Sequence, residues 1–301
     1  MRLRKILKII GLSLLALILA ACTLVFWHFP HYLMNKQVRH IEADPTAPVR
    51  MMSCNVRCLT PLDLGEKSWF YRADLLLSDI AGQKPGIIGF QEATRWQYDY
   101  LTEVLPRYDS VITYRDGSII AEGCPIFYHR DLYDLVDKGS FWLSETPDVM
   151  SKDWGAAHYR ICSYVILADK ASGKQFVVFN THLDHVSDEA RIKGIDVVLD
   201  KIDQFGGLPA VIMGDFNAEE GSQTYTAVTE NFLDARYETE NTTDSYTYQN
   251  WGNLEGARRI DYFMISKTGF RVEKYAVLPA VHDGVYASDH CPLVLEVTLT
   301  E

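Results

Sequence analysis

The most informative segment of this 301-residue chain is Pro209-Ala210-Val211-Ile212-Met213-Gly214-Asp215-Phe216-Asn217. Its apolar first half has the length and composition of a buried β-strand, and polar residues follow directly. Five other strand-like segments end in the same way, at Asn55, Gln91-Glu92, Asn180-Thr181-His182, Asp261 and Asp289-His290. Functional residues gather where the ends of rigid strands converge, so we expect these six endings to form one site.

The rest of the chain predicts a mixed α/β fold. Helical periodicity is found over residues 71–81, 96–105 and 188–205, between some of the predicted strands. Many strands with few helices in mixed order predict two sheets packed face to face, with the helices outside. The predicted strands, rich in Val, Ile, Phe and Tyr, are 50–55, 87–90, 110–114, 126–128, 162–168, 175–180, 210–213, 261–265 and 293–299.

The formal net charge of −11 is unevenly distributed along the chain. Residues 1–40 contain 6 of the 29 basic residues and no acidic residue, which leaves 23 basic against 40 acidic residues, a balance of −17, in 41–301. A body this acidic repels polyanions. The charge therefore argues against a stable complex with nucleic acid, but it allows an enzyme that holds a cation in a cleft.

The first thirty residues have the features of a membrane-targeting segment. Basic residues at 2, 4, 5 and 8 precede the uncharged stretch 9–27, whose 19 residues are enough for a transmembrane helix. This order predicts a cytoplasmic N-terminus and a domain outside the cytoplasmic membrane. An uncleaved signal anchor is favoured because residues 23–27 continue the apolar run. A lipoprotein modified at Cys22 is the alternative, because Leu19-Ala20-Ala21-Cys22 is similar to a bacterial lipobox, and a secreted product is the third possibility.

The remaining organisation is simple. Residues 31–48, including the polar, acidic and proline-containing stretch 40–48, predict a linker, and residues 49–301 predict one catalytic domain. The five cysteines beyond Cys22 lack zinc-ligand spacing, so we expect small buried apolar side chains. We expect the protein to act as a monomer on a phosphate-ester substrate.

The six strand endings carry the residue types that hydrolysis of a phosphate ester requires. The phosphoryl charge must be neutralised, water must be activated and the leaving oxygen must be stabilised. Mg²⁺ prefers oxygen ligands, which predicts Glu92, Asn55 and Asp289 as metal ligands, Asp289 directly or through water.

The remaining polar residues supply the groups that move protons and bind phosphate. His182 and His290 are predicted to donate hydrogen bonds to phosphate or to shuttle a proton, with Asp261 orienting His290. Asp215 is predicted to accept the proton of the attacking water, and Asn217 to hold the water or the phosphate.

These motifs resemble the endonuclease/exonuclease/phosphatase superfamily, in the same order, over about residues 49–299. The resemblance implies a four-layer α/β sandwich, dependence on Mg²⁺ or Mn²⁺, and a site at one rim of the two sheets. It also implies the metal role for Glu92, the base and phosphate roles for Asp215, Asn217, His182 and His290, and the orienting role for Asp261. The residues that carry it are Ser53-Cys54-Asn55-Val56-Arg57, Gln91-Glu92, Asn180-Thr181-His182-Leu183-Asp184-His185, Gly214-Asp215-Phe216-Asn217, Arg259-Ile260-Asp261-Tyr262 and Ser288-Asp289-His290-Cys291-Pro292, and Phe141–Asp148 adds a signature of a bacterial and fungal subgroup.

Several further residues have both a functional and a structural interpretation. Tyr128 and Arg160 are candidate phosphate contacts, although Arg160 is equally well explained by a surface salt bridge. Trp142 and Trp154 are candidate pocket walls or core residues. His185 orients a loop or contacts substrate, whereas Asp116, Glu122 and Asp184 are expected to be solvated or to order loops. The loops predicted to shape the pocket are 60–69, 115–123, 145–160 and 238–258.

The leading functional hypothesis is a metal-dependent phosphoesterase outside the cytoplasmic membrane, acting on a phosphomonoester or phosphodiester of a small or lipid-linked substrate. The alternative is an extracellular endonuclease or exonuclease acting on DNA or RNA. A membrane-anchored binding module on the same scaffold is the non-enzyme hypothesis, and it predicts a broken set of site residues, whereas every key position is filled here.

Overall fold

The computed structural model describes residues 2–301 and contains two large sheets that pack face to face. The first sheet is mixed and has seven strands in the order β12-β14-β17-β1-β2-β6-β4. Its strands are β1 (Val49–Asn55), β2 (Ile87–Gln91), β4 (Tyr108–Val111), β6 (Ile126–His129), β12 (Thr242–Thr243), β14 (Phe270–Val277) and β17 (Leu293–Leu299).

The second sheet has six strands in the order β11-β13-β10-β9-β8-β7. They are β7 (Tyr133–Trp142), β8 (Ile161–Asp169), β9 (Gln175–His182), β10 (Ala210–Asp215), β11 (Phe232–Asp234) and β13 (Asp261–Ser266). Two small ribbons flank the sheets, one formed by β3 (Ala93–Thr94) and β5 (Glu122–Gly123), the other by β15 (Val281–His282) and β16 (Val285–Tyr286).

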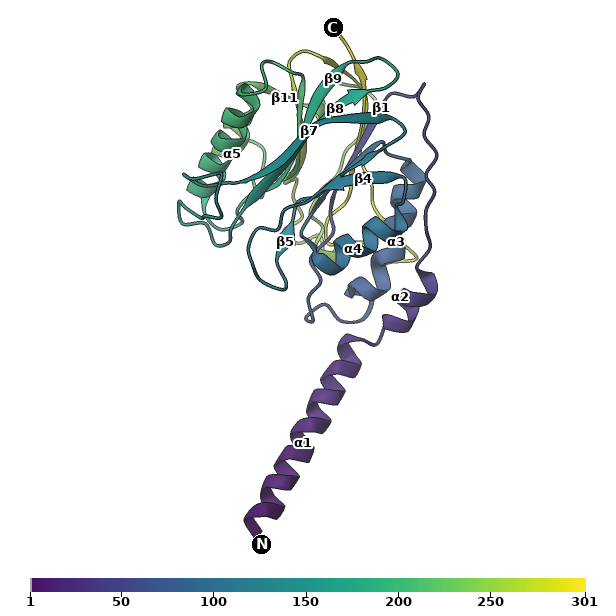
Figure 1. Ribbon diagram of the computed structural model, residues 1–301, viewed down its shortest axis with the longest axis vertical. Helices are drawn as coiled ribbons and strands as arrows, with labels where there is room; N and C mark the ends of the chain where they lie inside the picture. Colours follow the sequence, from purple (N-terminus) through teal and green to yellow (C-terminus); the bar gives the residue numbers. More distant parts are fainter. Residues whose placement is uncertain (1) are drawn as a thin grey trace.

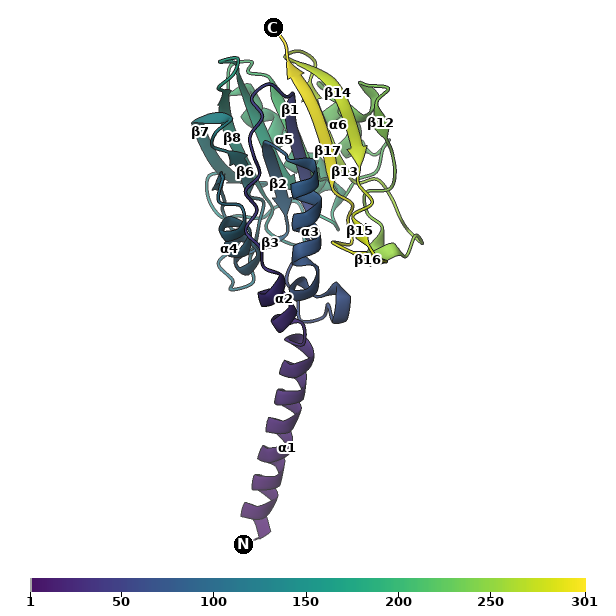
Figure 2. The ribbon, with the colours of Figure 1, turned by 90° about the vertical axis from the view of Figure 1, so that its right-hand side faces the viewer.

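Helices cover the outer faces of both sheets, so the domain has four layers (Figures 1 and 2). Helices α3 (Trp69–Gln83) and α4 (Arg95–Val104) pack on the first sheet, and α5 (Asp188–Asp203) and α6 (Gln223–Thr229) pack on the second. Each of the three interlayer spaces holds one buried apolar cluster, as burial of an apolar face on both sides of a sheet requires. The predicted four-layer sandwich is confirmed.

The strands β7 and β14 are absent from the sequence prediction. β7 is an edge strand, with Asp134, Asp137 and Lys138 exposed, so it lacks a long apolar run. β14 alternates charged and apolar residues, for example Arg271, Val272 and Glu273, and it lies next to the edge of the first sheet. Both strands are therefore too polar to be recognised by an apolar run alone.

The N-terminal segment consists of α1 (Arg2–Val25) and α2 (Phe29–Asn35), which precede the domain. The span Arg4–Asn35, which includes most of α1, is long and apolar enough to cross a membrane, and an 18-residue window within it has a mean hydropathy of 2.7. The α1 helix extends away from one end of the domain, whereas the C-terminus lies at the opposite end (Figure 1). Length and composition thus agree with an anchor or a signal sequence.

The segment expected as a linker is packed against the domain. Phe29 and Tyr32 of α2 contact Phe70, with ring centroids 5.4 and 5.5 Å apart. Further along, Ile41 is buried and its carbonyl oxygen lies 2.9 Å from His129 Nε2. Residues 31–48 therefore follow the domain surface as a strap, which the polar composition of this stretch does not predict.

A buried polar bridge connects the two sheets near one rim. Asn180 in β9 donates from Nδ2 to the carbonyl oxygens of Phe90 (2.8 Å) and Pro125 (2.9 Å) in the facing sheet. Its Oδ1 accepts a hydrogen bond of 2.6 Å from Gln91 Nε2. Gly89 leaves room for this contact, since an added Cβ would lie 2.9 Å from the Asn180 side chain. One amide therefore satisfies three groups and fixes how the sheets align.

Substitution of Asn180 by alanine should reduce the free energy of unfolding by about 3 kcal/mol, because two carbonyl oxygens and the Gln91 amide each lose one hydrogen bond without access to water. Urea denaturation of the N180A variant measures this change. The exposed Asn231 provides the control, and N231A should stay within about 0.5 kcal/mol of the wild type. An unchanged denaturation midpoint for N180A contradicts the bridging role.

Candidate active site at the rim of the two sheets

Strands from both sheets end at the same rim and bring their terminal side chains together. Because β1 runs antiparallel to β17, which leads to the C-terminus, Asn55 lies at the end of the domain that faces α1 (Figure 1). Asn55 Nδ2 donates to Glu92 Oε1 over 3.0 Å and to Asp215 Oδ2 over 3.1 Å. The predicted convergence of strand ends is thus present in the structure.

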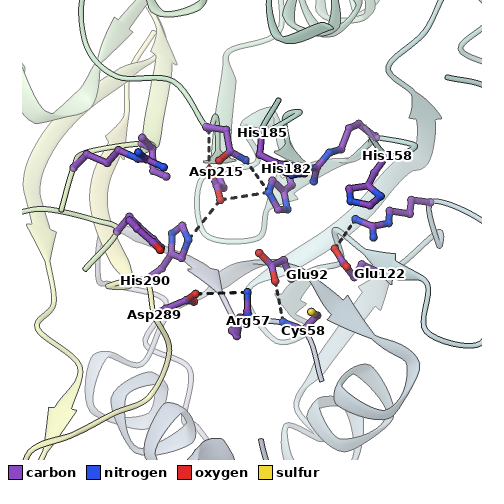
Figure 3. Close-up of a pocket in the computed structure, with 16 residues that line it drawn as sticks. Arg57, Cys58, Glu92, Glu122, His158, His182, His185, Asp215, Asp289 and His290 are labelled. Atoms are coloured by element: carbon purple, nitrogen blue, oxygen red, sulfur yellow. Dashed lines mark hydrogen bonds and ion pairs between the residues drawn. The ribbon is translucent and has the colours of Figure 1, made fainter. Parts of the chain in front are cut away.

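Asp215 lies at the centre of this arrangement. The imidazole Nε2 atoms of His182 and His290 lie 3.4 and 3.7 Å from Asp215 Oδ2 (Figure 3). On its other side, His290 Nδ1 lies 2.9 Å from Asp261 Oδ2. Asn217 binds Asp215 through its backbone N–H (2.8 Å) and donates from Nδ2 to His182 Nε2 (3.0 Å). The expected orienting contact between Asp261 and His290 is present.

Burial and neighbouring charges give His182 and His290 different charge states. Burial acts to lower the pKa of His290, but the Asp261 carboxylate outweighs it and raises that pKa to about 10. Burial and the positive charge of Arg160 hold the pKa of His182 well below its usual range. His290 is therefore an imidazolium at neutral pH and His182 a neutral imidazole, so one donates and the other can accept a proton or ligate a cation.

The carboxylates also differ from one another. Burial and the nearby Asp261 charge raise the pKa of Asp215, which makes it a suitable proton acceptor near neutral pH. Burial acts to raise the pKa of Glu92 as well, but hydrogen bonds from the Cys58 N–H and the Asn55 amide outweigh it and leave that pKa below its usual value. Glu92 is therefore a charged ligand at neutral pH.

Glu92 also has an unusual backbone conformation, with φ at +61°. Non-glycine residues avoid this left-handed region, and such residues concentrate at functional sites. The turn is held by Cys58 N–H, which donates to Glu92 Oε2 over 2.9 Å. The structure thus fixes the Glu92 carboxylate so that it points into the rim.

These residues line one polar cleft of about 330 Å³. Arginines stand around it at positions 57, 115, 160 and 258, and Figure 3 shows the acidic and histidine side chains pointing into it from opposite walls. The full lining consists of Arg57, Cys58, Glu92, Arg115, Glu122, His158, Arg160, His182, His185, Asp215, Asn217, Tyr248, Arg258, Ile260, Asp289 and His290. A cleft with four guanidinium groups suits a small anion of high charge density.

Asn55 and Asp261 lie immediately behind the lining, in contact with Glu92 and Asp215 in the first case and with His290 in the second. Asp289 lines the cleft, with Oδ2 3.9 Å from the guanidinium of Arg57. The structure therefore brings seven of the predicted site residues close together, whereas Tyr128 lies elsewhere. The seven are Asn55, Glu92, His182, Asp215, Asn217, Asp289 and His290.

The prediction that Tyr128 reaches a phosphate is wrong. Tyr128 is buried in the apolar cluster between the two sheets, and it pairs with Ile87 at the start of β2, whereas Glu92 follows the end of that strand. Its aromatic ring contributes apolar surface to the core, and strand register places it on the inner face far from the rim.

Arg160 lines the cleft and is buried, so the alternative of a surface salt bridge is wrong. Its guanidinium lies 3.5 Å from Asp184 Oδ2 and 3.1 Å from His185 Nδ1. Asp184 is also buried and accepts backbone N–H groups of Val186 and Ser187, which confirms its loop-ordering role. His185 joins the lining beside His158, with ring centroids 5.5 Å apart.

Glu122 is not solvated, but it orders the loop 115–122 as the second alternative expects, because it binds Arg115 at the other end of that loop. It lines the cleft, where burial and the Glu92 charge raise its pKa, and its Oε2 lies 2.7 Å from Arg115 Nη1. Trp142 does not line the cleft, but its indole N–H donates to the Arg115 carbonyl (2.9 Å) and so fixes this wall from behind. Cys58 also lines the cleft, whereas the other four cysteines of the domain are buried as expected.

Besides Cys58 and Ile260, sequence reasoning missed six polar residues of the lining: Arg57, Arg115, Glu122, His158, Tyr248 and Arg258. All but Arg57 lie within three of the four loops predicted to shape the pocket, so the segments were recognisable and the individual side chains were not. Behind Arg57, the buried Arg72 donates to the carbonyl oxygens of Val56, Arg57 and Ala287 and so ties two rim loops together.

The donor set fits a divalent cation. Ligand atoms of Glu92, His182 and Asp215 all lie within 4.8 Å of one another. Five acidic residues, Glu92, Glu122, Asp215, Asp261 and Asp289, are gathered around this point, and burial raises the pKa of three of them (Glu122, Asp215 and Asp289). A cation relieves the mutual repulsion of such carboxylates. Of the predicted ligands Glu92, Asn55 and Asp289, Glu92 belongs to this cluster, and the Asn55 amide lies 3.0 Å from Glu92 and 3.1 Å from Asp215.

Comparisons with known proteins identify the family of the chain. A sequence model of the Endonuclease/Exonuclease/phosphatase family matches residues 52–290. An endonuclease/exonuclease/phosphatase from Bacteroides vulgatus is 32% identical, with a TM-score of 0.79, over 85% of this chain and 100% of that chain. A mannosyl-6-phosphatase from Bacteroides thetaiotaomicron is 31% identical, with a TM-score of 0.75, over 83% and 100%. Uncharacterized protein L388 of Acanthamoeba polyphaga mimivirus is 30% identical over 75% of this chain and 91% of its own length.

The chain belongs to the Endonuclease/Exonuclease/phosphatase family. Members of this family are divalent-metal-dependent hydrolases of phosphate esters, and the chain is an enzyme of that class.

Replacement of Asp261 by asparagine should shift the alkaline limb of the pH profile of kcat/KM to a lower pH, by at least about two pH units. The reason is that the negative charge of Asp261, which raises the pKa of His290, is then absent. A raised pKa preserves the imidazolium up to about pH 10, and removal of its cause shifts the loss of that form to lower pH. Initial rates on a chromogenic phosphate ester between pH 5 and 11 measure the limb. D203N, at an exposed position, is the control, and an unmoved limb in D261N contradicts the role of His290.

Replacement of Glu92 by glutamine should weaken divalent-cation binding by at least about tenfold, because a charged oxygen ligand becomes a neutral amide of the same shape. Calorimetric titration of the full chain with Mn²⁺ measures the affinity without any turnover. E145Q, at an exposed position, is the matched control and should bind as the wild type does. Equal affinities of E92Q and wild type exclude Glu92 as a ligand.

Proposed function

We propose that the protein is a Mg²⁺- or Mn²⁺-dependent phosphoesterase that acts outside the cytoplasmic membrane, to which α1 anchors it. The observation that carries the proposal is the chain of contacts from Asp261 through His290 to Asp215, next to Glu92, on the floor of a cleft with four arginines. This arrangement combines a proton acceptor, an imidazolium donor and an anion-binding wall within one cleft.

The cleft favours a small phosphorylated group over a polymer. Its volume of about 330 Å³ is at the lower end of small-molecule sites. The balance of −17 over residues 41–301 opposes the approach of nucleic acid, while the arginines at 57, 115, 160 and 258 act only at short range within the cleft. The likeness to a mannosyl-6-phosphatase supports a small phosphoester as the substrate class. We also propose that the protein works as a monomer.

In the proposed reaction, Asp215 accepts a proton from the water that attacks phosphorus, the bond to the leaving oxygen breaks, and the leaving oxygen takes up a proton from solvent water. His290 stays protonated through its contact with Asp261 and donates a hydrogen bond to a phosphoryl oxygen. Asn217 Nδ2 donates to His182 Nε2, which shows His182 in its neutral form, and a cation at His182 would take the place of this hydrogen bond. The bound cation would be held by Glu92 with His182 and Asp215, and it would neutralise charge that develops on the phosphoryl group.

The location outside the membrane is supported by the N-terminal segment. α1 extends away from the domain (Figure 1), and basic residues at 4, 5 and 8 precede its apolar part. Positively charged flanks favour the cytoplasmic side of a membrane span. The domain then lies on the far side, and the strap over residues 31–48 holds it close to the point where α1 emerges.

Incubation of the full chain with Mg²⁺ or Mn²⁺ and a panel of sugar, lipid and nucleotide phosphates tests the proposal. We expect release of phosphate or of a phosphorylated product from at least one ester. E92Q and H290N should each lower kcat/KM by about 10²–10⁴-fold, as loss of a group that acts in the transition state does.

Plasmid DNA and a single-stranded RNA belong in the same panel, and the acidic surface predicts little cleavage of either. E145Q serves as the matched control for E92Q and should retain wild-type rates. Turnover that is unchanged in both E92Q and H290N contradicts the proposed site. Efficient digestion of DNA or RNA contradicts the proposed substrate class and supports the nuclease alternative.

A further inference from the structure

A second cavity, of about 270 Å³, lies beside the phosphate cleft and has an apolar lining. It is formed between the end of α1 and the rim of the domain. Six of its residues are Phe26, Leu59, Phe70, Trp96, Ile119 and Ile120, and we call this cavity the apolar groove. None of the residues assigned above to binding or chemistry of the phosphate lies in it.

The apolar groove and the cleft share three stretches of chain. In the first stretch, Cys58 lines the cleft and Leu59 lines the groove. In the second, Glu92 lines the cleft and Thr94 lines the groove. In the loop 115–122, Arg115 and Glu122 at its two ends line the cleft, whereas Ile119 and Ile120 at its tip line the groove. The pairing of Thr94 with Glu122 joins two of these stretches. The two cavities are therefore neighbours on one rim, one lined by charged residues of both signs and the other apolar.

The rim around the groove exposes large apolar side chains to solvent. Ile119 is 96% exposed, Ile120 73% and Leu62, in the loop that follows Leu59, 85%. Exposed apolar side chains in a group mark a surface that meets a membrane, a ligand or another protein. The exposed loop tips thus require an apolar partner.

The position of α1 identifies that partner. Val25 and Phe26, at the end of α1, form part of the groove itself. The helix leaves the domain from the end that carries β5 and the loop 115–122 (Figure 1). A helix that spans a bilayer therefore places this rim at the lipid surface, and the indoles of Trp27 and Trp96, both at least half exposed, suit the interfacial region.

We propose that the apolar groove holds the hydrocarbon chain of a membrane lipid whose phosphate group occupies the cleft. This inference rests on the proposed function, because it requires the anchor and the phosphoesterase site. It narrows the substrate class to a phosphorylated amphiphile drawn from the bilayer that α1 spans. The acidic body repels an anionic surface, so apolar contact at the rim, and not charge, holds the domain against the lipid.

The test compares long-chain and short-chain forms of one head group, using the full chain in nanodiscs. The probes are dioleoyl and dihexanoyl phosphatidic acid, with the two corresponding phosphatidylglycerols, and mass spectrometry detects the products. We expect kcat/KM for the dioleoyl form, relative to the dihexanoyl form, to fall at least about tenfold in I119S/I120S, through KM. The exposed pair Val149 and Met150 lies outside the groove, and V149S/M150S should keep the ratio within about twofold.

Hydrogen exchange provides a readout that does not depend on turnover. Residues 59–64 and 115–122 should exchange more slowly in nanodiscs that contain dioleoyl phosphatidic acid than in phosphatidylcholine nanodiscs, and I119S/I120S should remove this difference. Melting temperatures of both variants show that they are folded.

The outcomes separate the two proposals. A chain-length ratio that I119S/I120S leaves unchanged, with soluble esters still hydrolysed, overturns the lipid inference and leaves the phosphoesterase intact. No turnover of any ester, lipid or soluble, overturns the proposed function and the inference with it.

Discussion

The hydrogen bond between Asp261 and His290 joins the two sheets of the sandwich, since Asp261 begins β13 and His290 precedes β17. Five acidic residues meet at this rim in a region with little access to water, where unpaired charges are costly. The imidazolium of His290 lies between Asp261 and Asp215 and offsets part of their repulsion. The raised pKa of His290 follows from the charge of Asp261, which outweighs the effect of burial, and the positive charge that results is available to a phosphate.

The architecture places this charged rim where the anchor begins. Parallel strands β1 and β2 in one sheet, and β9 and β10 in the other, all end on the side of the domain from which α1 extends. The inner layer holds the sheets in register through apolar packing and the Asn180 bridge. The loops at the rim are thus free to vary in chemistry, and in this chain they supply arginines to one cavity and isoleucines to its neighbour.

The strand endings were predictable from sequence because an apolar run that stops at a carboxylate or imidazole is a local pattern. Glu92, Asp215 and His290 belong to this group, and the structure brings them together as that pattern indicates. Arg115 and Arg258 gave no such signal, since a loop arginine near a site has the same local sequence as one on the surface. Tyr128 is the opposite case, a residue predicted for the site that lies in the core. Its position depends on the strand register, which cannot be read from the sequence. The strap over 31–48 is ordered by tertiary contacts that its polar composition does not indicate.

The most direct test of the account is a crystal structure of the protein with Mn²⁺ and inorganic phosphate, in which anomalous scattering locates the metal. The account predicts a manganese peak at about 2.1 Å from a Glu92 carboxylate oxygen. It also predicts a phosphate in the cleft within hydrogen-bonding distance of His290 Nε2 and at least one of the four arginines. A manganese ion bound elsewhere, with Glu92 free of metal at saturating Mn²⁺, contradicts the account.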